Sequence, residues 1–195
     1  MATLTVLLKR AIAKDFADYL IWLGFRPEKE NRGILPFRRS GSERDDLVEV
    51  QFDKYNRPKF VINFGVAPSH GIIDAYGRFL PTAKVQVAHL VHNGRLHRWP
   101  YSVAWFRPNT FMGLRSPESS VKRELAHLIH VFQQVEHWFK TGKSGPNIWI
   151  YMNPENAPGV RRKSMQERGV WPPDGWTEED EEAVKKAESL PLRPP

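Results

Sequence analysis

Three histidines stand at helical spacing in one segment, and histidine is the commonest metal-ligating side chain. His127, His130 and His137 lie at positions i, i+3 and i+10, and two histidines three residues apart on a helix can reach one metal ion. This stripe is turned by about 200° from the apolar stripe of the same segment, and no carboxylate occupies a clear third-ligand position. We therefore expect a solvent-facing polar stripe, and we assign no metal ligand and no other cofactor.

A second group of histidines surrounds the end of a candidate strand. His89 and His92 point to opposite faces if that strand continues, and His97 follows beyond a turn. Metal ligands have to converge on one point, and this spacing does not bring three of them together.

Two carboxylates are the best candidates for acid–base chemistry, because Glu49 and Asp53 share one face of a predicted strand with Gln51 between them. Acid–base enzymes need titratable groups in contrasting environments, and the pattern shows no such contrast. The chain contains no G-x-S-x-G elbow, no H-E-x-x-H and no Walker-type phosphate loop. It also has no cysteine, which excludes disulfides and thiolate chemistry. We therefore predict no catalytic residue, and a hydrolytic or metal-dependent enzyme is the third-ranked function.

Arginine and tryptophan gather instead in the segment that follows the Asn93-Gly94 turn signal. These two residue types most often dominate protein interfaces, and they also stack on bases and pair with phosphates. Two amides on a predicted strand pair supply further polar groups. The predicted binding residues are Arg95, Trp99, Trp105, Arg107, Gln51 and Asn63.

The charge is uneven along the chain. There are 29 Lys and Arg against 22 Asp and Glu, a net charge of +7. Residues 174–195 hold seven acidic and three basic groups, so residues 1–173 carry +11. A basic body with an acidic tail suggests a polyanionic or acidic partner for the body, and a tail that folds back onto it.

Neither a membrane span nor a leader is predicted. No stretch approaches the roughly eighteen apolar residues of a span. The short apolar run Leu4–Leu8 precedes Lys9 and Arg10, which reverses the order of a secretory signal. We expect a cytoplasmic protein.

Two long helices are predicted from apolar spacing. Residues 4–24 carry apolar side chains at three- and four-residue intervals and end at Gly24. Residues 117–140 begin with Ser116 as the N-cap and end at Gly142.

The strands alternate with period two. Residues 47–53 and 59–66 form a predicted hairpin in which Phe52 faces Phe60, leaving a semi-polar second face. The candidate strands are 34–39, 47–53, 59–66, 83–91, 103–106 and 148–152. We predict an α+β fold, in which an antiparallel sheet of four to six strands packs one face against both helices.

The composition changes near Asn153. We interpret residues 1–152 as one α+β domain and 153–195 as a Pro-rich extension, with a short acidic helix near 178–189. Thr177 and Asp180 form a capping-box pattern at its start. Trp171 and Trp176 are the expected anchors of the extension on the body.

Several short motifs resemble a bacterial family. Leu23–Arg26, Val48–Phe52 and Phe60–Val66, with the later Arg95-Leu96 and Trp105-Phe106, are similar to the domain-of-unknown-function family numbered 4304. The resemblance covers roughly residues 16–107. It implies a bacterial α+β domain without an established activity, so it transfers no catalytic residue.

Two functions outrank an enzyme. The first is a non-catalytic protein-binding module with an immunity-like, inhibitory or accessory role. The alternative is nucleic-acid binding through the basic body.

Overall fold

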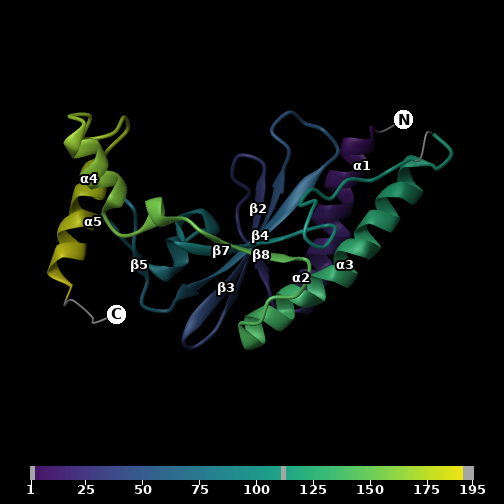
Figure 1. Ribbon diagram of the computed structural model, residues 1–195, viewed down its shortest axis with the longest axis horizontal. Helices are drawn as coiled ribbons and strands as arrows, with labels where there is room; N and C mark the ends of the chain where they lie inside the picture. The colour runs from purple at the N-terminus through teal and green to yellow at the C-terminus, as the bar shows by residue number, and fades with distance from the viewer. Residues whose placement is uncertain (1–2, 111–112, 191–195) are drawn as a thin grey trace.

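The helices α1, α2 and α3 cover one face of an antiparallel sheet, so the fold is α+β as the sequence predicts (Figure 1). The computed structural model describes residues 3–110 and 113–190. The six-stranded sheet has the order β1-β2-β3-β4-β7-β8. Its strands are β1 (Arg26–Pro27), β2 (Ile34–Ser40), β3 (Arg44–Phe52), β4 (Phe60–Pro68), β7 (His92–Leu96) and β8 (Ile148–Met152).

The remaining elements flank this sheet. A small hairpin pairs β5 (Ile72–Ile73) with β6 (Phe79–Leu80). The α-helices are α1 (Leu4–Ala11), α2 (Ala17–Trp22), α3 (Pro117–Thr141), α4 (Val160–Glu167) and α5 (Glu178–Ser189). Four short turns are the π turn η1 (Ile12–Phe16) and the 3₁₀ turns η2 (Thr82–Lys84), η3 (Val87–His89) and η4 (Pro154–Asn156).

The predicted helix over residues 4–24 is α1, η1 and α2 in continuous succession. The Thr3 side chain caps it by accepting a hydrogen bond from the Val6 N–H. Its buried face includes Leu8, Phe16 and Leu20. The helix ends before Gly24, whose φ of +90° suits glycine.

The predicted helix over 117–140 is α3. Ser116 caps the Ser119 N–H, and Gly142 ends the helix in the left-handed conformation. Its apolar stripe packs on the sheet and on the N-terminal helices. Phe132, for example, meets the Phe16 ring edge-on with centroids 5.5 Å apart.

The β3–β4 hairpin has the predicted register, with Phe52 opposite Phe60. Alternation sends Val48 and Val50 to the helix-covered core, and it sends Glu49 and Gln51 to the other face. This second face is the one on which the predicted polar residues meet.

The prediction of a strand over residues 83–91 is wrong, because the 3₁₀ turns η2 and η3 occupy this segment. The Arg38 guanidinium donates hydrogen bonds to the carbonyl oxygens of Thr82 (2.9 Å) and Val85 (2.8 Å). The segment lies across the second face of the sheet, where Val85 and Leu90 join a small apolar cluster. Carbonyls that bond a side chain in this way do not form a strand ladder.

Two further strand-level expectations differ from the structure. Asn93 and Gly94 are not a turn but lie inside β7, where the Phe64 ring fills the space that a Cβ on Gly94 would occupy. Residues 103–106 form only an isolated bridge, between Phe106 and Phe60.

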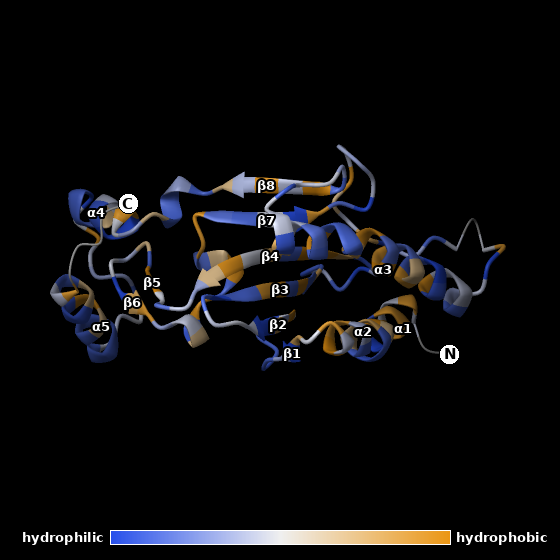
Figure 2. Cartoon of the chain, turned by 90° about the horizontal axis from the view of Figure 1, so that it is seen from below, coloured by the Kyte–Doolittle hydropathy of each residue, from blue (hydrophilic) through white to orange (hydrophobic). Residues whose placement is uncertain are grey.

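The elements α4 and α5 pack beside the β5–β6 hairpin, at the opposite end of the molecule from α1 and α3 (Figure 2). The Arg78 guanidinium bonds both Asp74 and Asp180 at 2.6 Å. The expected anchors Trp171 and Trp176 both contact the ring of Tyr76. The short helix near 178–189 is α5, with the predicted Thr177–Asp180 capping box.

Helix α4 was not predicted, since its sequence has little apolar character. Nowhere in residues 3–110 or 113–190 does a helix have the length and apolar character needed to cross a membrane.

Candidate functional site

Three of the predicted binding residues form one row across the sheet face that the helices leave uncovered. Gln51, Asn63 and Arg95 come from β3, β4 and β7, and the strand register sets them side by side. The Asn63 amide donates to the Gln51 side-chain oxygen (3.0 Å), and Arg95 Nε donates to the Asn63 side-chain oxygen (2.8 Å). These bonds fix the orientation of all three side chains.

Strand β8 extends this row with two aromatic residues that sequence reasoning did not find. The Arg95 guanidinium lies 5.6 Å from the ring centre of Tyr151. The Trp149 indole stacks on the His97 imidazole with centroids 4.9 Å apart, while Trp149 remains 43% exposed. Burial beneath the indole lowers the pKa of His97. Alternation along 148–152 is the only sequence signal that could have placed both rings on this face.

Trp105 reaches the same face by a different route. Its neighbour Phe106 forms the bridge to Phe60 and is buried in the core, so Trp105 projects to the opposite side. Lys59 Nζ lies 4.0 Å from the centre of the Trp105 ring. Trp105 and Gln51 line one surface depression of about 510 Å³, which also contains the β3–β4 turn.

Two more depressions continue from this one. The second, of about 490 Å³, is lined by Arg107 and shares Arg57 with the first. The third, of about 240 Å³, is lined by Trp99 and shares Asn109 with the second. Four of the six predicted binding residues therefore line a connected series of depressions. The other two, Asn63 and Arg95, lie beside it on the sheet.

The lining of this series is strongly basic, and we call its nine Lys and Arg side chains the basic track. They come from five separated parts of the sequence. The members are Lys9, Arg32, Lys54, Arg57, Lys59, Arg98, Arg107, Arg115 and Arg123.

Two carboxylates also line the depressions, and both are buried against cations of the track. Asp53 accepts hydrogen bonds from Arg57, which hold the pKa of that carboxyl well below its usual range. Glu124 accepts from Arg98 Nε (2.7 Å) and Nη2 (3.0 Å). Because both acids are neutralised in place, the surface of the series is dominated by positive charge.

Exposed aromatic rings alternate with these cations. Tyr55 is 67% exposed and lies within 5.1 Å of both Lys54 Nζ and the Arg57 guanidinium. Trp99 is 49% exposed, with Arg98 4.8 Å from its ring centre. Rings of this kind offer flat apolar faces between positive charges.

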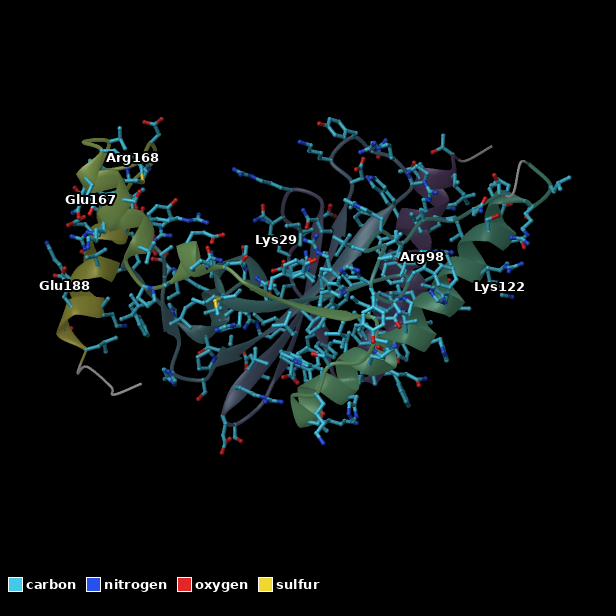
Figure 3. All side chains as sticks on the ribbon, in the orientation of Figure 1. Lys29, Arg98, Lys122, Glu167, Arg168 and Glu188 are labelled. Atoms are coloured by element: carbon cyan, nitrogen blue, oxygen red, sulfur yellow. The ribbon has the colours of Figure 1, made fainter. Side chains whose placement is uncertain are left out.

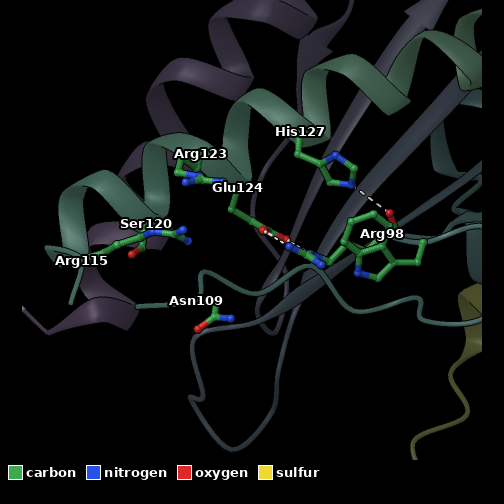
Figure 4. Close-up of a pocket in the computed structure, with 8 residues that line it drawn as sticks. Arg98, Asn109, Arg115, Ser120, Arg123, Glu124 and His127 are labelled. Atoms are coloured by element: carbon green, nitrogen blue, oxygen red, sulfur yellow. Dashed lines mark hydrogen bonds and ion pairs between the residues drawn. The ribbon is translucent and has the colours of Figure 1, made fainter. Parts of the chain in front are cut away.

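The histidine stripe of α3 is not solvent-facing along its whole length, which corrects the sequence interpretation. The segment 97–110 crosses the first half of α3 and buries Ser120 and Glu124. His127 Nε2 donates to the Arg98 carbonyl oxygen at 2.8 Å (Figure 4). His130 and His137, further along the helix, are exposed.

No group of three or more His, Cys, Asp or Glu within the described ranges is arranged to hold a metal ion. His89 Nδ1 instead accepts a hydrogen bond from the Gln86 N–H.

Glu49 and Asp53 have the contrasting environments that the sequence did not reveal. Burial raises the pKa of Glu49, which accepts a hydrogen bond from the Val87 N–H, whereas the pKa of Asp53 is lowered. Glu49 lies within β3 and Asp53 directly follows its last residue, so four residues of extended chain, about 13 Å, separate them. Glu49 lines none of the three depressions, so the two carboxylates do not face a common site.

No family model matches the chain, and neither a curated protein nor a solved structure matches it. The resemblance to the family numbered 4304 therefore stays a prediction.

Proposed function

We propose that the protein binds single-stranded nucleic acid along the basic track. The observation that carries this proposal is the charge of the three connected depressions: nine cations line them, and the two carboxylates among them are buried and ion-paired. A polyanion gains from such a surface along its whole length, because each phosphate contact releases counterions.

The aromatic residues favour a single strand over a duplex. Stacking on Tyr55, Trp99 or Trp105 requires a base whose flat face is free, and single strands supply such bases. The cations between the rings suit the intervening phosphates. The polar row of Gln51, Asn63 and Arg95 lies beside the track and offers hydrogen bonds to base edges.

The direct test is fluorescence anisotropy with labelled 20-nucleotide RNA and DNA of mixed sequence, at 50 and 200 mM salt. For about four phosphate contacts we expect affinity to fall about 50-fold between these salt concentrations. The double variant Lys59→Gln/Arg107→Gln should weaken binding and flatten the salt dependence. Absence of binding to either strand at 50 mM salt would overturn the proposal.

A charge-matched control separates a local site from general basicity. Lys163→Gln/Arg168→Gln removes the same two charges from the extension. Figure 3 shows Arg168 at the far end of the molecule from Arg98. This control variant should keep most of the wild-type affinity. Equal losses in the two double variants would mean that net charge alone, and not the basic track, attracts the strand.

A protein partner, which the sequence ranks first, is the second candidate, and the edge of β8 favours it. This strand pairs with β7 on one side, and within the described residues no strand pairs with its other side. It contains no charged residue and no proline, the usual protections of an edge. Ile150 is 43% and Met152 68% exposed, so an extended segment of a partner could add to this edge.

Binding of a protein partner at β8 predicts that a substitution in this strand affects the partner and not the oligonucleotide. In protein isolated from its host, Ile150→Lys should remove a co-purifying chain and leave oligonucleotide affinity unchanged. If the same partner is retained by Ile150→Lys, strand addition at β8 is wrong. For either function we propose a bacterial cytoplasmic setting, in line with a chain that contains no cysteine.

A further inference from the structure

One edge of the six-stranded sheet is protected and the other is open. The β1 edge consists of the charged Arg26 and of Pro27, and both residue types discourage pairing with a further strand. The β8 edge lies at the opposite border of the sheet (Figure 2) and contains neither a charge nor a proline. A strand that adds to this sheet is therefore favoured beside β8.

The pairing of β7 with β8 decides which backbone groups point outward. Directly after β8, the Asn153 N–H donates to the Val91 carbonyl oxygen at 2.7 Å. Before β8, the His97 N–H donates to the Asn147 carbonyl oxygen at 2.7 Å. Hydrogen-bonded positions alternate along an antiparallel pair, so the odd-numbered residues of β8 bond β7 and the even-numbered ones point away. Ile150, at the centre of the strand, therefore presents its N–H and C=O to the open edge.

A second copy of β8 fits this edge in an antiparallel arrangement. Since the strand has five residues, a twofold axis at its centre sets Ile150 opposite Ile150 of the other copy, where two hydrogen bonds form. The same register sets Trp149 opposite Tyr151. It also sets Ile148 opposite Met152. Aromatic residues then face aromatic residues, apolar residues face apolar ones, and no like charges meet within the strand pair.

The charges on either side of β8 favour the same arrangement. Lys143 precedes the strand and Glu155 follows it, and both side chains are exposed. Neither forms an ion pair within the part of the chain that the structure describes. Antiparallel pairing brings the first end of one strand to the last end of the other, so opposite charges approach at both ends of the interface. Parallel pairing would instead bring like charges together.

We propose that two copies of this chain associate through β8, with Ile150 on the twofold axis. The two sheets then continue into each other, and the exposed Ile150 and Met152 side chains become covered. This inference names a second copy as the partner in the second candidate function, and it rests on that function. No residue of β8 lines the three depressions, so each copy keeps its own basic track.

The chain contains no cysteine, so one introduced thiol tests the register. With oxidised glutathione, Ile150→Cys should cross-link to itself, because Cα atoms in a hydrogen-bonded antiparallel pair are about 5.5 Å apart and disulfides span about 4.4–6.8 Å. Met152→Cys is the control, since its side chain is more exposed. In this register the two copies of that position lie about 14 Å apart. Cross-linking of Met152→Cys as fast as that of Ile150→Cys would overturn the proposal.

Analytical ultracentrifugation at about 100 µM protein measures the association itself, since a short strand pair forms a small and weak interface. The wild type should be a dimer, and Ile150→Lys a monomer, because two like charges would meet at the axis. Val6→Lys is the matched control: this α1 side chain is 45% exposed, against 43% for Ile150. It lies near the other edge of the sheet (Figure 2), so this variant should stay dimeric. Thermal melting establishes that both variants are folded.

A charge exchange tests the direction of pairing. Lys143→Glu should raise the dissociation constant of the dimer about fivefold, because like charges then meet at both ends. Lys143→Glu/Glu155→Lys should restore the wild-type constant. Lys29→Glu, an exposed change beside β1, alters the net charge equally and should leave the constant unchanged. Failure of the double variant to recover would overturn antiparallel pairing.

The outcomes separate this inference from the functions proposed above. A monomeric wild type from which Ile150→Lys removes a different protein chain would overturn the dimer and leave the second candidate function intact. A monomeric wild type with no other chain bound would overturn both. A dimer that Ile150→Lys dissociates would support the inference whatever the oligonucleotide titration shows, because β8 lies outside the basic track.

Discussion

The Arg57 guanidinium donates one hydrogen bond to each oxygen of the Asp53 carboxylate, from Nε and from Nη2, both at 2.9 Å. The two residues are four apart and close the turn between β3 and β4. Both line the depression that also contains Gln51 and Trp105, and Arg57 belongs to the basic track. The same contact therefore stabilises the hairpin and neutralises an acid on the surface where we propose that a polyanion binds.

The Asp53–Arg57 contact predicts a specific dependence of stability on pH. Its hydrogen bonds place the folded-state pKa of Asp53 below the unfolded value of about 3.9. A carboxyl with a lowered pKa contributes stability above the unfolded pKa, and this contribution is lost as pH falls toward the folded pKa. Asp53→Asn should lower Tm by a few degrees at pH 7, and the difference from wild type should shrink progressively below about pH 4.

Thermal melting monitored by circular dichroism from pH 7 to pH 2.5 measures this difference. Asp18→Asn removes an exposed carboxylate of α2 and should change Tm little at any pH. A Tm difference for Asp53→Asn that stays constant from pH 7 to pH 2.5 would contradict the ionic explanation.

The core between α3 and the N-terminal helices predicts a large loss of stability at Phe132. This side chain is fully buried and meets the rings of Phe16 and Tyr19 edge-on. Phe132→Ala should lower the free energy of unfolding by about 3–5 kcal/mol, from lost burial and the cavity that remains. Urea unfolding measures the change. Gln133→Ala, at an exposed neighbouring position, is the control, and a loss below about 1 kcal/mol for Phe132→Ala would contradict the packing.

The helices and the central hairpin could be predicted because their signals are local. The apolar spacing of α3 and the alternation of β3 and β4 each follow from burial of one face. The Phe52–Phe60 register then placed Gln51 and Asn63 on the second face. Each of these patterns lies within about 25 residues of sequence. The predicted helix and strands form in the structure because their tertiary contacts bury the same apolar faces.

The rest depends on contacts between distant segments. Residues 83–91 form 3₁₀ turns and not the predicted strand. Arg38, some 45 residues earlier in the sequence, donates hydrogen bonds to carbonyl oxygens at the start of this segment. The two rings of β8 joined the row only through pairing with β7. The basic residues are scattered in the sequence and converge only in space. The sequence therefore ranks a protein partner above a nucleic acid, and we propose the reverse order from the charge of the surface.

The Asn93-Gly94 pair predicts a turn but lies inside β7, and the packing around Gly94 leads to a prediction. A Cβ at this position would overlap the ring of Phe64, so Gly94→Ala should destabilise the protein by about 1–3 kcal/mol through overpacking. Phe64→Leu in the same chain makes room, and the double variant should lose less than the sum of the two single losses. Strictly additive losses in urea unfolding would show that the ring is not what excludes a side chain.

The ion pairs of Arg78 predict how the extension is held. Its guanidinium bonds Asp74 beside the β5–β6 hairpin and Asp180 in α5. Arg78→Ala should raise the open population of α4 and α5 about fivefold, as a weakening of about 1 kcal/mol implies. Limited proteolysis should then cleave near residues 153–159 correspondingly faster. Lys163→Ala, an exposed change in α4, should not accelerate cleavage, and an unchanged rate for Arg78→Ala would contradict this docking.

A substitution at Tyr55 distinguishes the contribution of stacking to the proposed nucleic-acid binding from the contribution of charge. Its ring is two-thirds exposed between Lys54 and Arg57, and stacking contributes about 1–3 kcal/mol per base in comparable sites. Tyr55→Ala should weaken binding of a single strand about tenfold and leave the slope of log affinity against log salt unchanged, since no charge is lost. Lys54→Gln, which removes the exposed cation on the other side of the Tyr55 ring, should instead reduce that slope by about 0.7. Trp22→Ala, which removes an exposed ring on α2 outside the track, is the control, and a loss there equal to that of Tyr55→Ala would mean that the strand does not follow the basic track.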